Sequence, residues 1–313
     1  MRPLVAGLSV LLLLGWALNV GPAGQLWGAH SLGWPELLEL RGWRSLLALA
    51  EGAGLATCGL LMQTLFRNPL VDASLLGVSQ GAALGMVLAL SLGWGVGQQE
   101  CSAALLALLL LSVLVLLLHR GWHWSLDTVL LAGLALNALL GAFLQLWLSL
   151  LSAERLQGVW GFLQGSLAQA RPLAVGMTSL STAGLWWWAY RQYRALDWLL
   201  LGEAAANSAG IPVQRLHRQL VVLCALTVAV LVSQAGVIGF VGMLAPALVR
   251  WRMTGGHKYW LPQIAWLGGV LVLLADILAR ILVSPAELPV GVISSLLGAP
   301  FFVYFLFLGP RSL

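Results

Sequence analysis

Few residues in this sequence have the type and spacing to support chemistry. Gly77, Ser79 and Gly81 match the G-x-S-x-G pattern of a serine nucleophile elbow. That elbow requires a strand before the serine and a helix after it, whereas this copy lies between two apolar segments that are expected to be membrane helices. Small residues packing at a helix start explain the pattern better. An intramembrane serine hydrolase that uses Ser79 is kept as a rival hypothesis.

Histidine spacing offers one candidate for metal ligation. His119, His123 and Asp127 recur every four residues, which on a helix would place two imidazoles and a carboxylate on one face. Gly121 interrupts that helix, and the nearby tryptophans are typical of a membrane-interface belt. The other histidines are expected in loops and the cysteines in apolar segments. None has a ligand-spaced partner, which predicts neither a metal site nor redox chemistry: His30, His217, His257, Cys58, Cys101 and Cys224.

Ionisable side chains inside apolar segments are costly and are therefore functional candidates. Asp276 and Arg280 stand four residues apart and are expected to pair, which lets both remain charged in a poor solvent. Glu51 lies in another apolar segment. Two roles stay open for Glu51: it lines a polar path, or it pairs with Arg44 or another outer charge.

Nucleotide binding by the usual phosphate loop is excluded. The only lysine, Lys258, follows His257, so the pattern G-x-x-x-x-G-K-[ST] cannot occur in the chain. If a nucleotide drives this protein, another subunit must bind it.

Composition fixes the class of protein. Of 313 residues, 60% are hydrophobic and 9% are charged, and the mean hydropathy is +0.92, whereas about a quarter of a soluble domain is charged. A membrane helix needs about 20 apolar residues, so around ten spans would leave only short connections. The net charge of +5 comes from residues scattered at span ends rather than from a nucleic-acid-binding face. We therefore expect an all-α, polytopic membrane protein with a single transmembrane domain, residues 1–313.

The apolar runs predict the order of the spans. Residues 4–20 resemble a signal-peptide core, but the chain that follows is itself membrane-embedded, so they are interpreted as the first span. An outer loop is expected up to Trp43, and a short surface helix within residues 152–172. The expected spans are 4–20, 44–65, 81–96, 101–118, 128–151, 173–189, 220–233, 240–250, 262–283 and 292–308.

Basic residues test this topology, because positive charge concentrates on the cytoplasmic side. With the N-terminus inside, the inner side holds Arg2, Arg67, Arg120, Arg191, Arg194, Arg215, Arg218, Arg250, Arg252, Lys258 and Arg311. The outer side holds Arg41, Arg44, Arg155, Arg171 and Arg280. The bias has the required direction and places both termini in the cytoplasm.

The longest interval without a bilayer-length apolar run is Tyr190 to Gln219. Gly202 is expected to break a short helix, residues 203–209 to form another, and Gly210 with Pro212 to end it. The flanking arginines indicate the cytoplasmic side. Two interpretations stay open: an ordinary surface connector, or a ridge whose small residues let a partner protein approach the backbone.

Glycine and proline positions favour a transporter or channel over an inert anchor. Gly52, Gly54 and Gly59, together with residues 236–242, allow close helix packing. Helix breaks at prolines expose backbone that must be buried in protein or line a cavity. For Asn137, lining a path and packing helices are both open. The permeation and gating candidates are Gln63, Asn68, Pro69, Asn137, Gly239, Pro246, Glu287 and Pro289, with breaks expected at Asn68-Pro69, Pro246 and Pro289.

Four longer motifs occur in order along the chain. They are GLLMQTLFRNPLVDASLLGVSQGA at 59–82, LGEAAANSAG at 201–210, GVIGFVGMLAP at 236–246 and ELPVGVISSLLGAPFF at 287–302. With these motifs the chain resembles the permease subunit of ABC importers for iron-siderophores, haem and cobalamin. The motifs extend over nearly the whole chain, so the resemblance is specific.

The resemblance implies the ten-helix permease fold of a type II importer, in a bacterial inner membrane. It implies a homodimer with the translocation path at the subunit interface, two cytoplasmic ATPase subunits that hold ATP and magnesium, and a periplasmic substrate-binding protein. This chain would bind no cofactor and catalyse no covalent step. Arg41 and Arg44 match outer arginines that dock acidic residues of the binding protein. The coupling segment, about 199–212, matches the helices that sit in a cleft of the ATPase through Gly202, Glu203, Ala205, Ser208 and Gly210.

The chain departs from the family pattern at several positions. Trp43 stands where the family has a proline, and Ala247 where it usually has a histidine. Ala204 and Asn207 replace a frequent second acid and an arginine in the coupling segment. Docking there is expected to depend more on shape, or the cognate ATPase to differ in charge.

Ferric siderophore is the commonest cargo of such chains and is the expected substrate, with haem or cobalamin as the alternative. A rival of another class is an ion-coupled secondary transporter that uses Glu51 and Asp276 as its coupling carboxylates.

Overall fold

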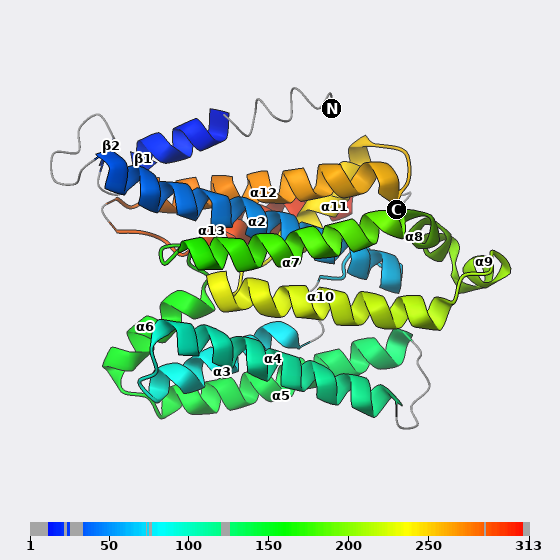
Figure 1. Cartoon of the computed structure of the whole chain (residues 1–313), viewed down its shortest axis with the longest axis horizontal. Helices are drawn as coiled ribbons and strands as arrows, with labels where there is room; N and C mark the ends of the chain where they lie inside the picture. The colour runs from blue at the N-terminus through cyan, green and yellow to red at the C-terminus, as the bar shows by residue number, and fades with distance from the viewer. Residues whose placement is uncertain are drawn as a thin grey trace.

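The computed structural model describes residues 12–21, 24–25, 34–72, 74, 77–119, 126–284 and 286–308. Residues 12–19 are helical, and two short antiparallel strands follow, β1 (Val20–Gly21) and β2 (Gly24–Gln25). The longer helices run roughly side by side along the long axis of the molecule (Figure 1). The expectation of an essentially all-α fold is confirmed.

Regular structure after β2 consists of helices. Among the described residues, four stretches are long and apolar enough to cross a bilayer: Glu39–Phe66, Thr128–Ser149, Val213–Ala235 and His257–Ile281. Shorter apolar helical stretches are Val78–Ser91 and Val290–Phe301. The count of ten spans stays a prediction. The helices are α2 (Trp34–Phe66), α3 (Val78–Ser91), α4 (Val96–His119), α5 (Leu126–Ser149), α6 (Ala153–Leu163), α7 (Pro172–Arg191), α8 (Tyr193–Leu201), α9 (Glu203–Ser208), α10 (Val213–Ala235), α11 (Val241–Arg252), α12 (His257–Ile281) and α13 (Val290–Leu308).

Helix α2 is the centre of the fold. It packs against α7, α10, α11 and α12, and its membrane-length stretch is largely buried. Helices α3, α4, α5 and α6 form a second group, which lies below α10 in Figure 1. Helix α2 therefore connects the elements that carry the candidate sites at both ends of the bundle.

Glycines bring α2 unusually close to two of its neighbours. A Cβ added at Gly52 would lie 2.1 Å from the carbonyl oxygen of Gly268 on α12. One added at Gly59 would lie 1.9 Å from the carbonyl oxygen of Gly242 on α11. These backbones pack at a distance that a β-carbon would prevent, so the predicted close helix packing is confirmed.

Two predicted boundaries are wrong. Helix α2 begins at Trp34, so residues 34–43 are helical rather than an outer loop. Pro35 lies in the first turn, where its missing N–H costs no helical hydrogen bond. Helix α11 continues through Pro246 instead of breaking there. The other expected proline breaks are confirmed, because α2 ends before Pro69 and α13 begins directly after Pro289.

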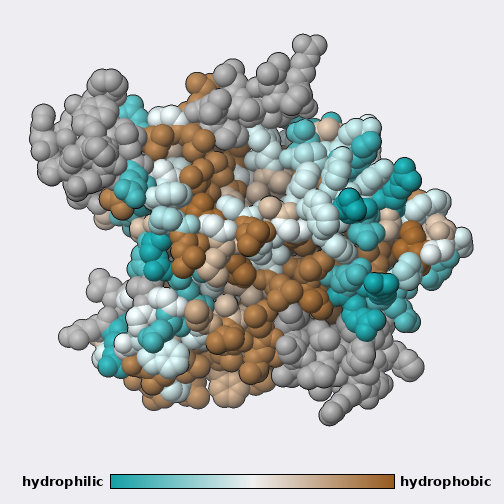
Figure 2. Space-filling model, in the orientation of Figure 1, coloured by the Kyte–Doolittle hydropathy of each residue, from teal (hydrophilic) through white to brown (hydrophobic). Residues whose placement is uncertain are grey.

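Charge and hydropathy divide the molecule along its long axis. An apolar band crosses the middle of the face in Figure 2, with hydrophilic residues towards both ends. Arg67, Arg191, Arg215, Arg252 and Lys258 lie at or just beyond the ends of α2, α7, α10, α11 and α12 that are nearest to α8 and α9. Arg2, Arg120 and Arg311 lie outside the described residues. This arrangement agrees with the two sides predicted from charge, and the assignment of one side to the cytoplasm stays a prediction.

Candidate functional site

The coupling segment is a short helix held between two glycines in unusual conformations. Gly202 separates α8 from α9 with φ 122° and ψ 158°, which only glycine adopts readily. At the other end Gly210 has φ 76°, and the Ile211 N–H donates to the Ala206 carbonyl at 3.0 Å. This is a Schellman ending, which needs a left-handed residue after the helix. The predicted break at Gly202 and ending at Gly210 are confirmed.

Helix α9 presents a surface of small side chains. Ala206 is buried against the protein, whereas Ala204, Asn207 and Ser208 are exposed. Glu203 begins the helix, where its carboxylate faces the positive end of the helix dipole. Because few long side chains cover α9, another protein can approach its backbone closely. The geometry therefore fits the docking-ridge interpretation of this segment.

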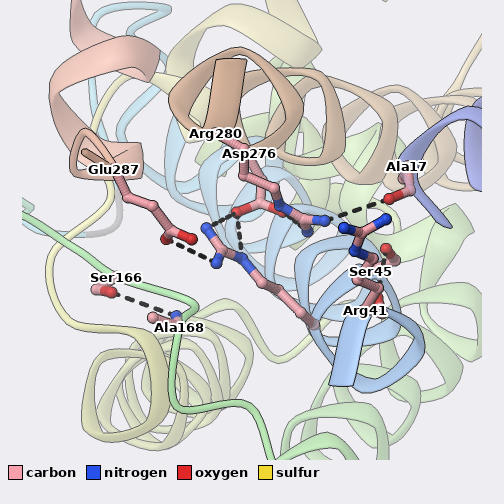
Figure 3. Close-up of polar contacts among 9 residues, drawn as sticks. Ala17, Arg41, Ser45, Ser166, Ala168, Asp276, Arg280 and Glu287 are labelled. Atoms are coloured by element: carbon pink, nitrogen blue, oxygen red, sulfur yellow. Dashed lines mark hydrogen bonds and ion pairs between the residues drawn. The ribbon is translucent and has the colours of Figure 1, made fainter. Parts of the chain in front are cut away.

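At the opposite end of the bundle, four ionised side chains form a cluster, here called the outer charge cluster: Arg44, Asp276, Arg280 and Glu287. Arg44 bridges two carboxylates, with guanidinium nitrogens 2.8 Å from Asp276 Oδ1 and 2.8 Å from Glu287 Oε2. Arg280 pairs with the other oxygen of Asp276, as the spacing predicted. Figure 3 shows Asp276 with its partners on α2 and α12. Two positive and two negative charges balance, so the cluster can be buried without a net charge.

The two outer arginines are already engaged within the chain. Arg41 is 7% exposed and donates to the Leu18 carbonyl oxygen at 3.0 Å. The Arg44 side chain is 11% exposed and holds the outer charge cluster together. Their predicted role in docking a binding protein is carried forward as a proposal. In this structure their contacts join the 12–19 helix, α2 and the segment before α13.

Glu51 has a different partner from the one considered from the sequence. It is 1% exposed, and the Thr178 hydroxyl on α7 donates to its carboxylate at 3.4 Å. Arg44 is committed to Asp276 and Glu287, so the pairing of Glu51 with Arg44 is wrong. Glu51 thus lies between α2 and α7, buried in the bundle.

Gln63 explains how α11 continues through Pro246. Proline has no N–H, so the carbonyl of Gly242, four residues earlier, loses its helical donor. The Gln63 side chain supplies a replacement by donating from Nε2 to that carbonyl at 3.3 Å. Arg250, one turn further along α11, donates to the Gln63 Oε1. Gln63 and Pro246 are both buried, and the bonds of Gln63 join α2 to α11.

The remaining permeation candidates fall into two groups. Asn68, which precedes Pro69, caps the turn after α2 by accepting the Leu70 N–H at 2.9 Å. Asn137 on α5 donates to the Ser74 carbonyl at 3.3 Å. These contacts connect helices and turns. Gly239 instead lines a cavity of about 580 Å³ with both polar and apolar walls: Leu163, Gln164, Val237, Gly239, Gly291, Val292, Ser295, Leu296, Ala299 and Pro300. Glu287 and Pro289 precede α13, which forms one wall of this cavity.

Sequence reasoning missed a polar connection beside the coupling segment. His257 begins α12 rather than lying in a loop, and its ring nitrogens lie 2.6 Å from Asp197 Oδ1 and 2.8 Å from Thr64 Oγ1. Partial burial of Asp197 opposes its ionisation, but hydrogen bonds from the His257 ring and backbone outweigh this effect, so the pKa of the carboxyl is lowered. His217 is also helical, on α10. The spacing of 60 residues between Asp197 and His257 gave no local signal.

The hydrolase and metal hypotheses gain no support from the described part of the chain. Ser79 is buried on α3 with no strand before it, so the nucleophile-elbow geometry is absent there. Among the residues whose placement is described, no group of three or more His, Cys, Asp or Glu side chains is arranged to hold a metal ion. His30 and His123 lie outside the described residues, and His119 is the last residue of α4.

A bundle of apolar helices, several of them long enough to cross a bilayer, is the architecture of a polytopic membrane protein. Comparisons with known proteins agree over nearly the whole length. The chain is 37% identical over 311 residues to the hemin transport system permease protein HmuU of Yersinia pestis, covering 95% of this chain and 92% of that protein. It is 33% identical over 317 residues to the vitamin B12 import system permease protein BtuC of Citrobacter koseri, covering 96% and 93%.

The structural comparison gives the same class. A protein assigned to the metal-chelate type of ABC transporter, solved in an inward-facing conformation, matches with a TM-score of 0.86 and 28% identity, covering 97% of this chain and 98% of that one. A model of the FecCD transport family matches residues 4–307. The chain belongs to the FecCD transport family. It is a permease subunit rather than an enzyme, as expected from the sequence.

Proposed function

We propose that this chain is the membrane permease of an ATP-driven importer for a metal chelate. The observation that carries the proposal is similarity over nearly the whole chain to permeases named for hemin and vitamin B12. Haem and cobalamin are both macrocyclic metal chelates, so they now stand beside ferric siderophore, the substrate expected from the family alone. The higher identity to the hemin permease favours haem as the first substrate to test.

The active assembly would contain two copies of this chain, two ATPase subunits and a periplasmic binding protein, in a bacterial inner membrane with both termini of the permease in the cytoplasm. Helix α5 supports the homodimer, because its apolar stretch is only 22% buried within one chain, against 61% or more in the other three. Its exposed side chains include Leu131, Leu139, Phe143 and Leu146. The ATPase subunits would bind ATP and magnesium, and this chain would bind no cofactor.

Alternating access provides the mechanism. Helix α9 would sit in a cleft of the ATPase and transmit the closure of the nucleotide-bound dimer through α8 to the membrane helices. The cavity beside Gly239 and Ser295 would lie on the substrate path, between α13 and the 163–164 segment. At the outer mouth, acidic residues of a binding protein would compete with Glu287 for Arg44, whose bond to Glu287 is the most exposed contact of the outer charge cluster.

An ion-coupled secondary transporter is the alternative. It would need a carboxylate that exchanges a cation during transport. Asp276 is poorly suited, because two guanidinium groups already neutralise it and its side chain is 0% exposed. Glu51 has Thr178 as its hydrogen-bond partner and is the better candidate of the two.

Reconstitution distinguishes these mechanisms. The permease, its ATPase and its binding protein would be placed in proteoliposomes and offered haem, a ferric siderophore or cobalamin at matched concentrations. We expect uptake of one chelate that requires ATP and is unaffected by collapse of ion gradients. Uptake that follows an ion gradient without the ATPase would refute the proposal.

A further inference from the structure

Three side chains from three helices form a hydrogen-bonded series next to the coupling segment. Asp197 on α8 accepts the backbone N–H of His257 at 2.8 Å, and the same oxygen lies 2.6 Å from the His257 Nδ1. The other ring nitrogen of His257 lies 2.8 Å from the Thr64 hydroxyl oxygen on α2. This series, here called the Asp197 relay, connects α8 through the start of α12 to the interior of α2.

The relay is closely packed. His257 and Thr64 are both 0% exposed, and Trp260 meets the His257 ring edge-on at a centroid distance of 5.5 Å. A Cβ added at Gly256 would lie 2.6 and 2.7 Å from the two carboxylate oxygens of Asp197, so a side chain at that position would push the carboxylate away from His257. Asp197 therefore both caps the first turn of α12 and orients the His257 ring.

The order of carboxylate, imidazole and hydroxyl is also that of a hydrolase triad, but the surroundings do not fit hydrolysis. The Thr64 hydroxyl is buried and lies 2.9 Å from the Leu60 carbonyl of its own helix. A hydroxyl has one proton to donate, so Thr64 either donates to Leu60 and accepts from a doubly protonated His257 ring, or donates to Nε2 of a neutral ring. No substrate reaches this oxygen, and a role in transmitting movement fits the burial better than a role in catalysis.

We propose that the Asp197 relay transmits the movement of the coupling segment to α2 and α12, with Asp197 as the positioning residue. The inference rests on the proposed function, because it requires an ATPase docked on α9. Helix α8 leads into α9 through the single residue Gly202, so displacement of α9 pulls directly on α8. Figure 1 shows both short helices at the end of the bundle.

A directional bond is suited to this role. A charge-assisted hydrogen bond weakens steeply when its geometry changes, so a shift of α8 is felt at His257. The relay reaches α2 within two turns of Gly59, where the backbones of α2 and α11 touch, and one residue from Gln63, which holds α11. Movement delivered at Thr64 would therefore reach α11 and α12 together.

The test measures substrate imported per ATP hydrolysed in proteoliposomes. We expect Asp197→Ala to lower this ratio about tenfold and Thr64→Val severalfold, with ATPase binding and ATP hydrolysis retained, as for the loss of one link in a coupling free energy. Thr64→Ser keeps the hydroxyl, so this variant is expected to import as much substrate per ATP as the unaltered protein. Thr57→Val is the matched control, because Thr57 is a buried hydroxyl on α2 that bonds only the Ala53 carbonyl of its own helix in the contacts observed.

The outcomes separate the relay from the proposed function. If the unaltered protein shows no ATP-driven uptake, the proposed function fails. If the unaltered protein imports and Asp197→Ala and Thr64→Val both keep its ratio of substrate to ATP, the relay proposal is refuted. A proportional loss of hydrolysis and uptake, or an equal effect of Thr57→Val, would assign these residues to docking or folding and would also overturn it.

Discussion

Replacement of Asp276 by asparagine should destabilise the protein far more than the same change at Glu287. Both carboxylates accept from Arg44 at 2.8 Å, but the Asp276 side chain is 0% exposed and the Glu287 side chain 30% exposed. Asp276→Asn leaves two buried guanidinium groups with one peripheral carboxylate, and removing one partner of a buried pair costs about 3–5 kcal/mol. Glu287→Gln removes a partly solvated contact, for which about 0.2–1 kcal/mol is expected.

The assay is thermal denaturation of the purified protein in detergent, followed by the loss of the monodisperse peak in size-exclusion chromatography. At this chain length about 2 °C of Tm corresponds to 1 kcal/mol, so Asp276→Asn should lower Tm by roughly 6–10 °C and Glu287→Gln by roughly 2 °C or less. Adding Arg280→Met to Asp276→Asn should recover part of the loss, because it removes one uncompensated charge. Equal shifts for the two single variants would refute the view that burial, rather than distance, sets the strength of these pairs.

Three further outcomes follow from the packing. Gly59→Ala would place a Cβ 1.9 Å from the Gly242 oxygen, so the helices must separate by about 1.1 Å to reach even 3.0 Å. We expect this variant to lose about 1–3 kcal/mol of stability, measured by thermal denaturation. The loss should be larger than for Gly184→Ala, where the added methyl group meets open space. Glu51→Gln keeps an acceptor for Thr178, so ATP-driven uptake should persist, whereas abolished uptake with an intact fold would favour ion coupling. A membrane-impermeant maleimide added to spheroplasts should label Cys101, which is exposed at the end of the bundle opposite α9. Cys58 and Cys224 are buried and should stay unmodified. Labelling of Cys101 only after lysis would reverse the predicted orientation.

Local patterns in the sequence predicted much of this structure because they depend on neighbouring residues. The glycines at 202 and 210 bound a short helix, since only glycine adopts the backbone angles found there. The four-residue spacing of Asp276 and Arg280 predicted their pairing for the same reason. Gly52 and Gly59 predicted close packing, although the sequence could not say which helices they would contact.

The remaining features depend on residues that are distant in sequence. Arg44 meets Asp276 across 232 positions, so its membership of the outer charge cluster could not be read from spacing. The prediction of a break at Pro246 failed because Gln63, from another helix, satisfies the carbonyl that proline leaves without a donor. The prediction of a loop at His257 is wrong, because the glycines before it and Pro262 after it gave no sign that α12 begins there. The first turn of α12 is capped by Asp197, which comes from α8.

The most direct test of the central claim is ATP-driven uptake by a Glu203→Arg variant. Glu203 begins α9, so an arginine there reverses the charge at the surface proposed to meet the ATPase. Gln98→Arg is the matched control, because Gln98 is exposed near the start of α4, at the opposite end of the bundle. We predict that Glu203→Arg abolishes uptake and releases the ATPase during purification while the permease stays folded, and that Gln98→Arg changes neither. Full ATP-driven uptake by Glu203→Arg, with the ATPase still bound, would contradict the assignment of α9 as the coupling site.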